Sequence, residues 1–161
     1  MVWFCRVLLL LVFALFWGGL TFYTGIVLRI THAVVNDPMD GGLITQRVTS
    51  VLQILGVVTV VLMACNCVVV VRQSPKFGYV LIGCVTLLAG SLIGLFLVHG
   101  QLDTLIEAET YTITDREAFD TGHQRYNQLT TVEWLASLAY MTTTVFAWRA
   151  IDMAADQHSN A

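Results

Sequence analysis

The chain alternates between long apolar runs and short polar segments. A helix that crosses the hydrocarbon core of a bilayer needs about 20 predominantly apolar residues. Four runs are long enough, and they cover residues 7–28, 48–71, 77–98 and 129–148. Each run also contains glycine, threonine or another polar residue, which is typical of membrane helices that pack against one another. We therefore predict one all-α domain over residues 1–161, an integral membrane four-helix bundle.

The first run stands where a signal peptide would stand, but its pattern differs. Its apolar stretch is too long for a signal peptide, and no small-x-small cleavage site follows it. We predict that the run is kept as a membrane span.

The fourth run is preceded by a helix start signal. The sequence TDRE at 114–117 fits a capping box, in which Thr114 is the N-cap and Glu117 reaches back to it. A helix that begins near Asp115 and continues past Trp148 is longer than a bilayer is thick. We therefore predict a long fourth helix that lies partly outside the membrane, with residues 99–128 as the extramembrane segment.

Polar residues of this fourth helix fall on one stripe when they are placed at 3.6 residues per turn. The stripe contains Phe119, His123, Tyr126, Thr130, Glu133, Ser137 and Thr144. Val132 and Leu135 fall roughly opposite, so the stripe turns toward the other helices and leaves the apolar back to lipid. Glu133 then lies about one turn inside the membrane boundary, where an ionisable side chain is costly and usually has a partner or a function.

Candidate partners for this stripe lie at the same side of the predicted bundle. Arg29, His32 and Arg47 flank the first loop, and His99 ends the third run, with Asp103 one helical turn further on. The second run adds polar residues along one face near its start, including Gln53. We predict a structural polar network that contains Glu133, Tyr126, Asp103, Arg47 and Gln53.

Three interpretations of these residues remain open. The first is a structural cap, in which Glu133 pairs with an arginine such as Arg47 or Arg29 and the histidines bond to carboxylates. The second is a haem or transition-metal site that uses His99, His123 and His32, since histidine is a common ligand for both. The third is a proton or ion path through Glu133.

Composition supports the membrane class and narrows the function. Hydrophobic residues make up 57% of the chain and charged residues 12%, whereas soluble domains have about 45–50% apolar and about 25% charged residues. The net charge of −3 and the absence of a basic run argue against nucleic acid as a partner. The sequence has no cysteine metal motif, phosphate-binding loop, nucleophile elbow or H-E-x-x-H motif. We therefore expect no enzymatic activity.

Loop charges give a weak indication of orientation. Four crossings place both termini and the 72–76 loop on one side, where the basic residues are Arg6, Arg72, Lys76 and Arg149. The opposite side also has four arginines, but they are spread over two longer loops among eight carboxylates. Basic residues close to the spans favour the cytoplasmic side. We predict cytoplasmic termini and an acidic extracytoplasmic face.

Three segments resemble a bacterial family of four-helix integral membrane proteins of unknown function. They are FALFWGGLTFYTGIVLRI at 13–30, HGQLDTLI at 99–106 and FDTGHQRYNQLTTVEW at 119–134. The family is similar in outline to the CopD-like group of copper-resistance proteins and haem-associated oxidases. In the oxidase pattern a histidine precedes the first-helix Trp by about two turns, whereas this chain has Leu10 there, counted back from Trp17. The resemblance therefore implies the fold and weakens a transfer of haem chemistry.

The sequence as a whole predicts a non-enzymatic protein of the bacterial inner membrane. We expect an accessory or structural subunit that contacts the lipid bilayer and other membrane subunits, without a cofactor. The alternative is a haem- or metal-binding membrane protein that uses the histidine cluster His32, His99 and His123 at the acidic face.

Overall fold

A computed structural model describes residues 2–35, 38–107 and 112–159 of the chain. Its helices in chain order are α1 (Val2–Phe22), the π-helix η1 (Tyr23–Val27), α2 (Leu28–Val34), α3 (Pro38–Gln73), α4 (Pro75–Thr104) and α5 (Arg116–Ser159). The all-α prediction is confirmed. Within these described residues one short sheet occurs, made of β1 (Ile106–Glu107) and β2 (Thr112–Ile113), which lie between α4 and α5 in the chain.

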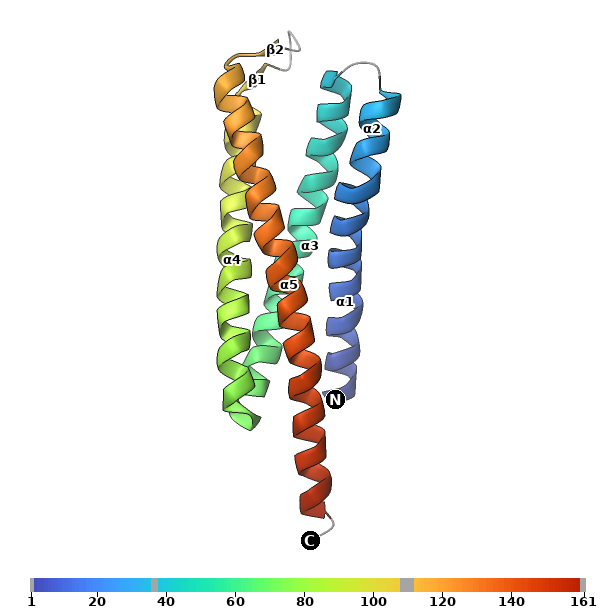
Figure 1. Cartoon of the computed structure of the whole chain (residues 1–161), viewed down its shortest axis with the longest axis vertical. Helices are drawn as coiled ribbons and strands as arrows, with labels where there is room; N and C mark the ends of the chain where they lie inside the picture. The colour runs from blue at the N-terminus through green and yellow to red at the C-terminus, as the bar shows by residue number, and fades with distance from the viewer. Residues whose placement is uncertain (1, 36–37, 108–111, 160–161) are drawn as a thin grey trace.

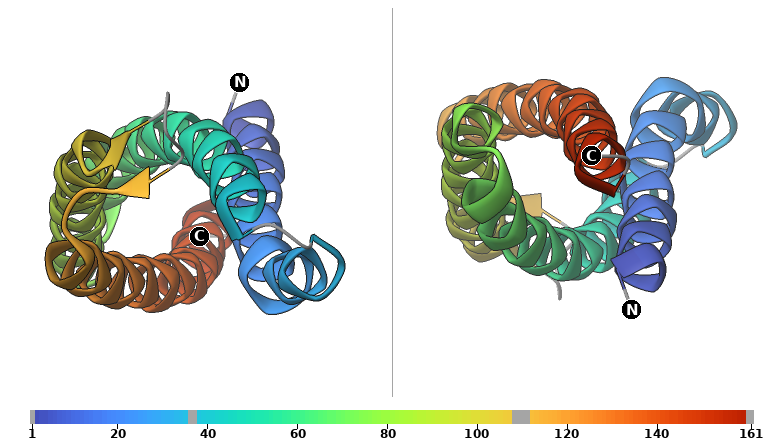
Figure 2. Two further views of the ribbon diagram at one scale, coloured as in Figure 1. Left: turned by 90° about the horizontal axis from the view of Figure 1, so that it is seen from above. Right: turned by 90° about the horizontal axis from the view of Figure 1, so that it is seen from below.

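Four helical rods lie side by side, because α1, η1 and α2 follow one another as one rod (Figure 1). Helix α4 packs against both α3 and α5, and α1 packs mainly against α3. Seen along the long axis, α3, α4 and α5 curve around a common centre, and α1 lies outside them against α3 and α5 (Figure 2). Both termini lie at one end of the molecule, and the β1–β2 hairpin lies at the other (Figure 1).

The hydrophobic core lies in the half of the molecule near the termini and joins all four rods. Its buried members are Leu9, Met63, Cys67, Val70, Leu81, Leu88, Ala136, Tyr140, Met141 and Ala147. A polar network runs through this core. The Tyr140 hydroxyl donates a hydrogen bond to the Met63 carbonyl at 2.7 Å and accepts one from Asn66 Nδ2 at 2.9 Å, and Trp148 Nε1 donates to Asn66 Oδ1 at 3.0 Å. The half-buried Asn66 amide is therefore hydrogen-bonded through both its nitrogen and its oxygen, as a polar group inside an apolar bundle requires.

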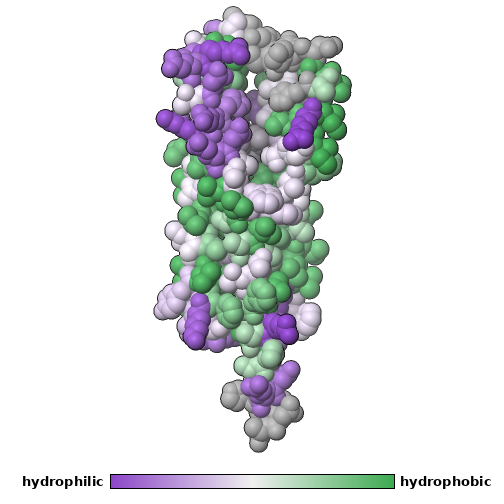
Figure 3. All heavy atoms as spheres, in the orientation of Figure 1, coloured by the Kyte–Doolittle hydropathy of each residue, from purple (hydrophilic) through white to green (hydrophobic). Residues whose placement is uncertain are grey.

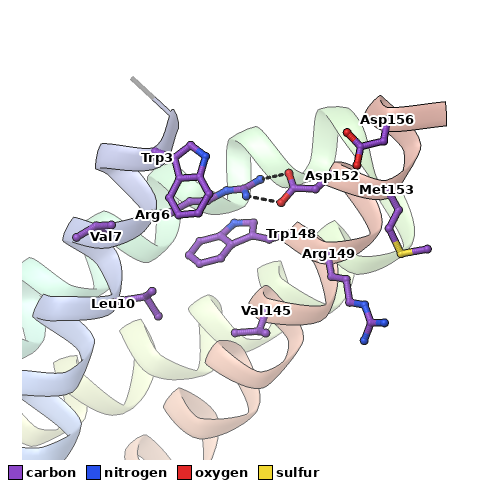
Figure 4. Close-up of a pocket in the computed structure, with 10 residues that line it drawn as sticks. All are labelled: Trp3, Arg6, Val7, Leu10, Val145, Trp148, Arg149, Asp152, Met153 and Asp156. Carbon is purple, nitrogen blue, oxygen red and sulfur yellow. Dashed lines mark hydrogen bonds and ion pairs between the residues drawn. The ribbon is translucent and has the colours of Figure 1, made fainter. Parts of the chain in front are cut away.

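An ion pair connects the two terminal segments near this end. The Arg6 guanidinium donates two hydrogen bonds to the Asp152 carboxylate, at 2.7 and 2.8 Å, and lies 5.1 Å from the centre of the Trp148 ring (Figure 4). The Arg6 hydrogen bond lowers the pKa of Asp152. Because α1 supplies Arg6 and α5 supplies Asp152 and Trp148, this contact fixes the position of the first helix against the last.

A second contact between α1 and α5 lies at mid-height. Trp134 Nε1 donates a hydrogen bond to Thr21 Oγ1 at 2.8 Å, and the Trp134 ring stacks on Trp17 with 5.3 Å between ring centres. Together with the Arg6 contact, this pair holds α5 along most of the length of α1.

The connection between α4 and α5 differs from the predicted one. Residues 99–104 continue α4, and the chain then forms a hairpin in which Ile106 pairs with Ile113 and Glu107 with Thr112. Thr114 closes this hairpin, because its backbone amide donates to the Leu105 carbonyl at 3.0 Å. The predicted capping box at Thr114 is therefore wrong by one residue. Asp115 is the residue that caps α5, since its carboxylate accepts a hydrogen bond from the Ala118 amide at 3.0 Å.

Apolar side chains cover the outer surface at mid-height. Within the described residues, three helical segments are long and apolar enough to cross a membrane, namely Trp3–Thr31, Asp40–Gln73 and Pro75–Thr104. Helix α5 is not among them, because threonines and Glu133 interrupt its apolar run. Hydrophobic residues occupy the middle of the visible surface, and hydrophilic residues gather toward both ends (Figure 3). A chain with this surface belongs in a membrane.

The turn between α3 and α4 gives a test of the packing. A Cβ atom added at Gly78 would lie 2.6 Å from the Val71 Cα, whereas one added at Gly83 would meet no atom within 4 Å. We expect Gly78→Ala to lower the free energy of unfolding by about 1–3 kcal/mol through overpacking. Gly83→Ala in the same helix is the matched control and should be neutral or raise stability by up to about 1 kcal/mol. Thermal unfolding in detergent measures both, and equal effects would contradict the close approach at Gly78.

Candidate functional site

A cavity of about 780 Å³ opens between the rods at the hairpin end of the molecule. Side chains from α1, η1, α2, α3, α4 and α5 line it, together with Ile106, Thr112 and Ile113 of the hairpin region. The core fills the space between the rods at the terminal end, so the cavity occupies the half that the core leaves open. Its volume lies within the range of about 300–1,000 Å³ that is typical of small-molecule sites.

The polar stripe of α5 forms one wall of this cavity. Its first five members line the wall: Phe119, His123, Tyr126, Thr130 and Glu133. The two deeper members, Ser137 and Thr144, are fully buried. On the opposite side of the helix Val132 and Leu135 are exposed, as the periodicity of the sequence predicts.

Glu133 is the most unusual group of the wall. Its residue surface is only 2% exposed, and its Oε1 atom has no hydrogen-bond partner. The Thr130 Oγ1 atom, one turn earlier on the same wall, is likewise buried without a partner. Among the described residues no ion pair reaches Glu133, so the expected pairing with Arg47 or Arg29 is wrong. Arg47 is exposed and does not line the cavity.

His99 is held on the facing wall by residues of α3 and α4. Its Nε2 atom lies 3.3 Å from Ser50 Oγ and 3.7 Å from Asp103 Oδ2. The Asp103 carboxylate also accepts a hydrogen bond from Gln46 Nε2 at 2.8 Å. These contacts connect α3 to α4 at the hairpin end and leave Asp103 with two partners inside the protein.

Ser50, His99 and Asp103 are the three residue types of a hydrolytic triad, but their geometry differs from one. In a triad the serine and the carboxylate contact opposite nitrogens of the imidazole ring. Here both contact the same nitrogen, Nε2. Ser50 Oγ also donates to the Gln46 carbonyl at 2.8 Å, so its proton is already used in a helix backbone contact.

Tyr126 and Gln53 meet across the cavity between α5 and α3. Gln53 is 4% exposed, and its Nε2 atom donates to the Tyr126 hydroxyl at 3.5 Å. Burial raises the pKa of the Tyr126 phenol, and the neighbouring Glu133 carboxylate contributes in the same direction. The Tyr126 hydroxyl and the Glu133 carboxylate are therefore electrostatic neighbours on one wall.

The histidines proposed as metal ligands occupy separate local environments. His123 packs edge-on against Phe119, with 4.5 Å between ring centres, whereas the His99 ring lies 6.3 Å from that of Tyr126. The side chain of His32 lies outside the described residues. No group of three or more His, Cys, Asp or Glu side chains suited to a metal ion occurs in the part of the chain that the structure describes.

The η1 segment is a part of the cavity that the sequence did not reveal. Its residues Tyr23, which is buried, and Thr24 line the wall. In η1 the backbone amide of Leu28 donates to the Tyr23 carbonyl, five residues earlier, instead of four. Such π-helical turns are rare in proteins as a whole, and those that occur are often found at functional sites. An apolar run gives no periodic signal for one extra residue in a turn, so the sequence predicts only a continuous α-helix here.

Comparison with known proteins assigns no family to the chain. No family model and no curated protein matches the sequence, and no solved structure matches the fold. The resemblance to the CopD-like group therefore stays a prediction. Function is inferred from the chemistry of the cavity itself.

The unpartnered carboxylate predicts an unusual response to mutation. Glu133→Gln removes a buried ionisable group whose Oε1 atom has no described partner, so the free energy of unfolding should stay unchanged or rise by about 1 kcal/mol. Asp103→Asn is the matched control, because that carboxylate accepts a hydrogen bond from Gln46 and lies near His99. It should cost about 1 kcal/mol, the difference between a charge-assisted and a neutral hydrogen bond. Chemical unfolding measures both, and an equal loss in the two variants would show that Glu133 is structurally paired.

His123 gives a prediction on pH. Burial lowers the pKa of His123, and the nearby Asp120 carboxylate opposes this shift only in part. The neutral ring is thus favoured in the folded protein, so its contribution to stability is present above the ordinary pKa of about 6.5 and is lost as the pH falls below it. NMR titration should give a midpoint below 6.5 for His123, and Phe119→Ala should raise that midpoint. A midpoint at or above 6.5 in the unmutated protein would contradict the shift.

Proposed function

We propose that this chain is a non-enzymatic integral membrane protein that binds a small ligand in the cavity at its hairpin end. The observation that carries the proposal is the buried Glu133 side chain, which lines a cavity of about 780 Å³ and whose Oε1 atom has no hydrogen-bond partner. A buried polar group without a partner costs about 1–3 kcal/mol. A ligand that supplies the missing partner removes this cost, so the unpartnered group makes the free energy of ligand binding more favourable.

In this proposal α5 crosses the membrane beside the three apolar helices. The support is that α5 packs along α4 and also contacts α1 and α3, so its middle lies at the depth of theirs. Its outward side chains Val132, Leu135, Val145 and Phe146 are exposed and apolar. Its polar stripe faces the cavity and the core, which is where a membrane helix places its polar groups. The domain is then a four-helix membrane bundle.

The proposed orientation puts both termini in the cytoplasm and opens the cavity on the extracytoplasmic side. The termini share one end of the molecule (Figure 1), and Arg6, Arg72, Lys76 and Arg149 lie in or beside the segments at that end. Basic residues next to membrane spans favour the cytoplasmic side. For a bacterial chain this membrane is the inner membrane.

Binding fits the cavity better than catalysis or haem chemistry. The Ser50, His99 and Asp103 side chains contact one another in a geometry that activates no nucleophile. The haem or metal alternative depends on His99 and His123, and each of these rings has its own neighbours on a different helix. The role of accessory subunit in a larger membrane assembly stays a prediction.

A cavity that takes ligands from water must be open to water while its outer wall faces lipid. Thr130 lines the cavity, whereas Val132, two residues further on, is 42% exposed on the outer surface. In a background that lacks the four free cysteines, we expect a membrane-impermeant methanethiosulfonate cation added to spheroplasts to modify Thr130→Cys. Val132→Cys is the matched control and should stay unmodified, because lipid protects a thiol from charged reagents. Equal labelling of the two variants, or an inert Thr130→Cys, would overturn the proposed site.

A further inference from the structure

We infer that the ligand is a small organic cation, a molecule with one protonated amine on an apolar or aromatic body. This inference rests on the proposed binding function and adds the chemical class of the ligand. It comes from the charges, the hydrogen-bonding groups and the apolar surface that line the cavity.

The charges of the lining favour a cation over an anion. Two carboxylates line the cavity, Glu133 and Asp103, against one arginine, Arg116. The Arg116 side chain is 81% exposed and lies 4.0 Å from Asp120, so it is solvated and close to an acidic partner. Asp103 already has Gln46 and His99 as neighbours. The buried carboxyl group left without a partner is that of Glu133.

The hydrogen-bonding groups also call for a donor from the ligand. Of the three side-chain amides that line the cavity, Asn127 is exposed to solvent, whereas Gln46 already donates to Asp103 and Gln53 to Tyr126. Among the described residues of the wall, the two unpartnered buried atoms are Glu133 Oε1, which accepts hydrogen bonds, and Thr130 Oγ1, a hydroxyl that can both accept and donate. They are one helical turn apart, so neighbouring N–H groups of a single ammonium can address both. A hydrogen bond that joins two charges in a desolvated site is stronger than one between neutral groups.

The remaining surface of the cavity suits the rest of such a ligand. The rings of Phe16, Tyr23, Phe119 and Tyr126 line the walls, and aromatic faces attract organic cations. Leu20, Leu28, Leu52 and Leu95 add an apolar surface for the body of the molecule. A bare metal ion fits this lining less well, since in the described part of the chain no three ligating side chains come together.

Three probes that differ only in the head group test the charge of the ligand. They are 4-(trifluoromethyl)benzylamine, the corresponding benzyl alcohol and the corresponding benzoate, each added to the full chain in lipid nanodiscs and followed by fluorine NMR. Empty nanodiscs correct for partition into lipid. We expect the amine to bind saturably and the benzoate to show no saturable binding. The alcohol should bind more weakly than the amine by about tenfold or more, which is the difference between a charge-assisted and a neutral hydrogen bond.

Variants then locate the charge that the amine meets. Glu133→Gln should weaken amine binding by about tenfold and leave alcohol binding unchanged, which also shows that the variant is folded. Glu117→Gln is the matched control, because it removes one exposed carboxylate of α5 that does not line the cavity, and it should leave amine binding unchanged.

The outcomes separate the two proposals. If the alcohol binds as tightly as the amine, or Glu133→Gln leaves amine affinity unchanged, the ligand is not a cation but the cavity still binds small molecules. If the benzoate binds best, the assigned charge is wrong in sign. If no probe binds saturably, both the cation and the proposed binding function are overturned. The ranking of the three probes on the unmutated chain decides the inference even if a variant fails to fold.

Discussion

The hydrogen bonds of Tyr140 with Met63 and Asn66 are the interaction on which the architecture depends. They join α5 to α3 inside an apolar core, where an unpaired hydroxyl or amide would be costly. Trp148 also takes part, because its Nε1 atom donates a hydrogen bond to the Asn66 side-chain oxygen. The network fixes the helices at the terminal end, and the space between them is filled there. Among the described residues no equivalent buried cluster closes the space between the rods toward the hairpin end, and the cavity that results is lined by polar as well as apolar side chains.

The position of Glu133 follows from the same division of the molecule. A carboxylate one helical turn or two deeper in α5 would enter the packed core, where Ser137 and Tyr140 are fully buried. A carboxylate nearer the helix start would be solvated, as Glu117 is. Glu133 lies between these zones, buried but beside open space. The chain therefore keeps a charge-bearing group where folding alone supplies no partner, which is a common property of binding sites.

Much of the fold and one wall of the site follow from periodicity. The three most apolar runs predict helices that the structure contains, and the stripe of α5 from Phe119 to Thr144 faces inward because 3.6 residues per turn leaves no other arrangement. The partners across the cavity were harder to predict, because they depend on how far apart the rods stand. Arg47 has the right charge and sequence position for Glu133, yet its side chain points outward. The β1–β2 hairpin is set by only two pairs of residues, too few for a recognisable strand pattern.

The π-helical turn of η1 has a consequence for how this chain can tolerate insertions and deletions. Because η1 accommodates one residue more than an α-helical turn, loss of a single residue there would restore ordinary helix geometry. The residues after it would keep about their present direction, because the wide turn had absorbed the extra residue. Loss of one residue from the regular helix α1, where each residue advances the helix by about 100°, would instead turn every later side chain of the first rod away from its present neighbours. The turn η1 is therefore a place in the first rod where this wall of the cavity tolerates a change in chain length.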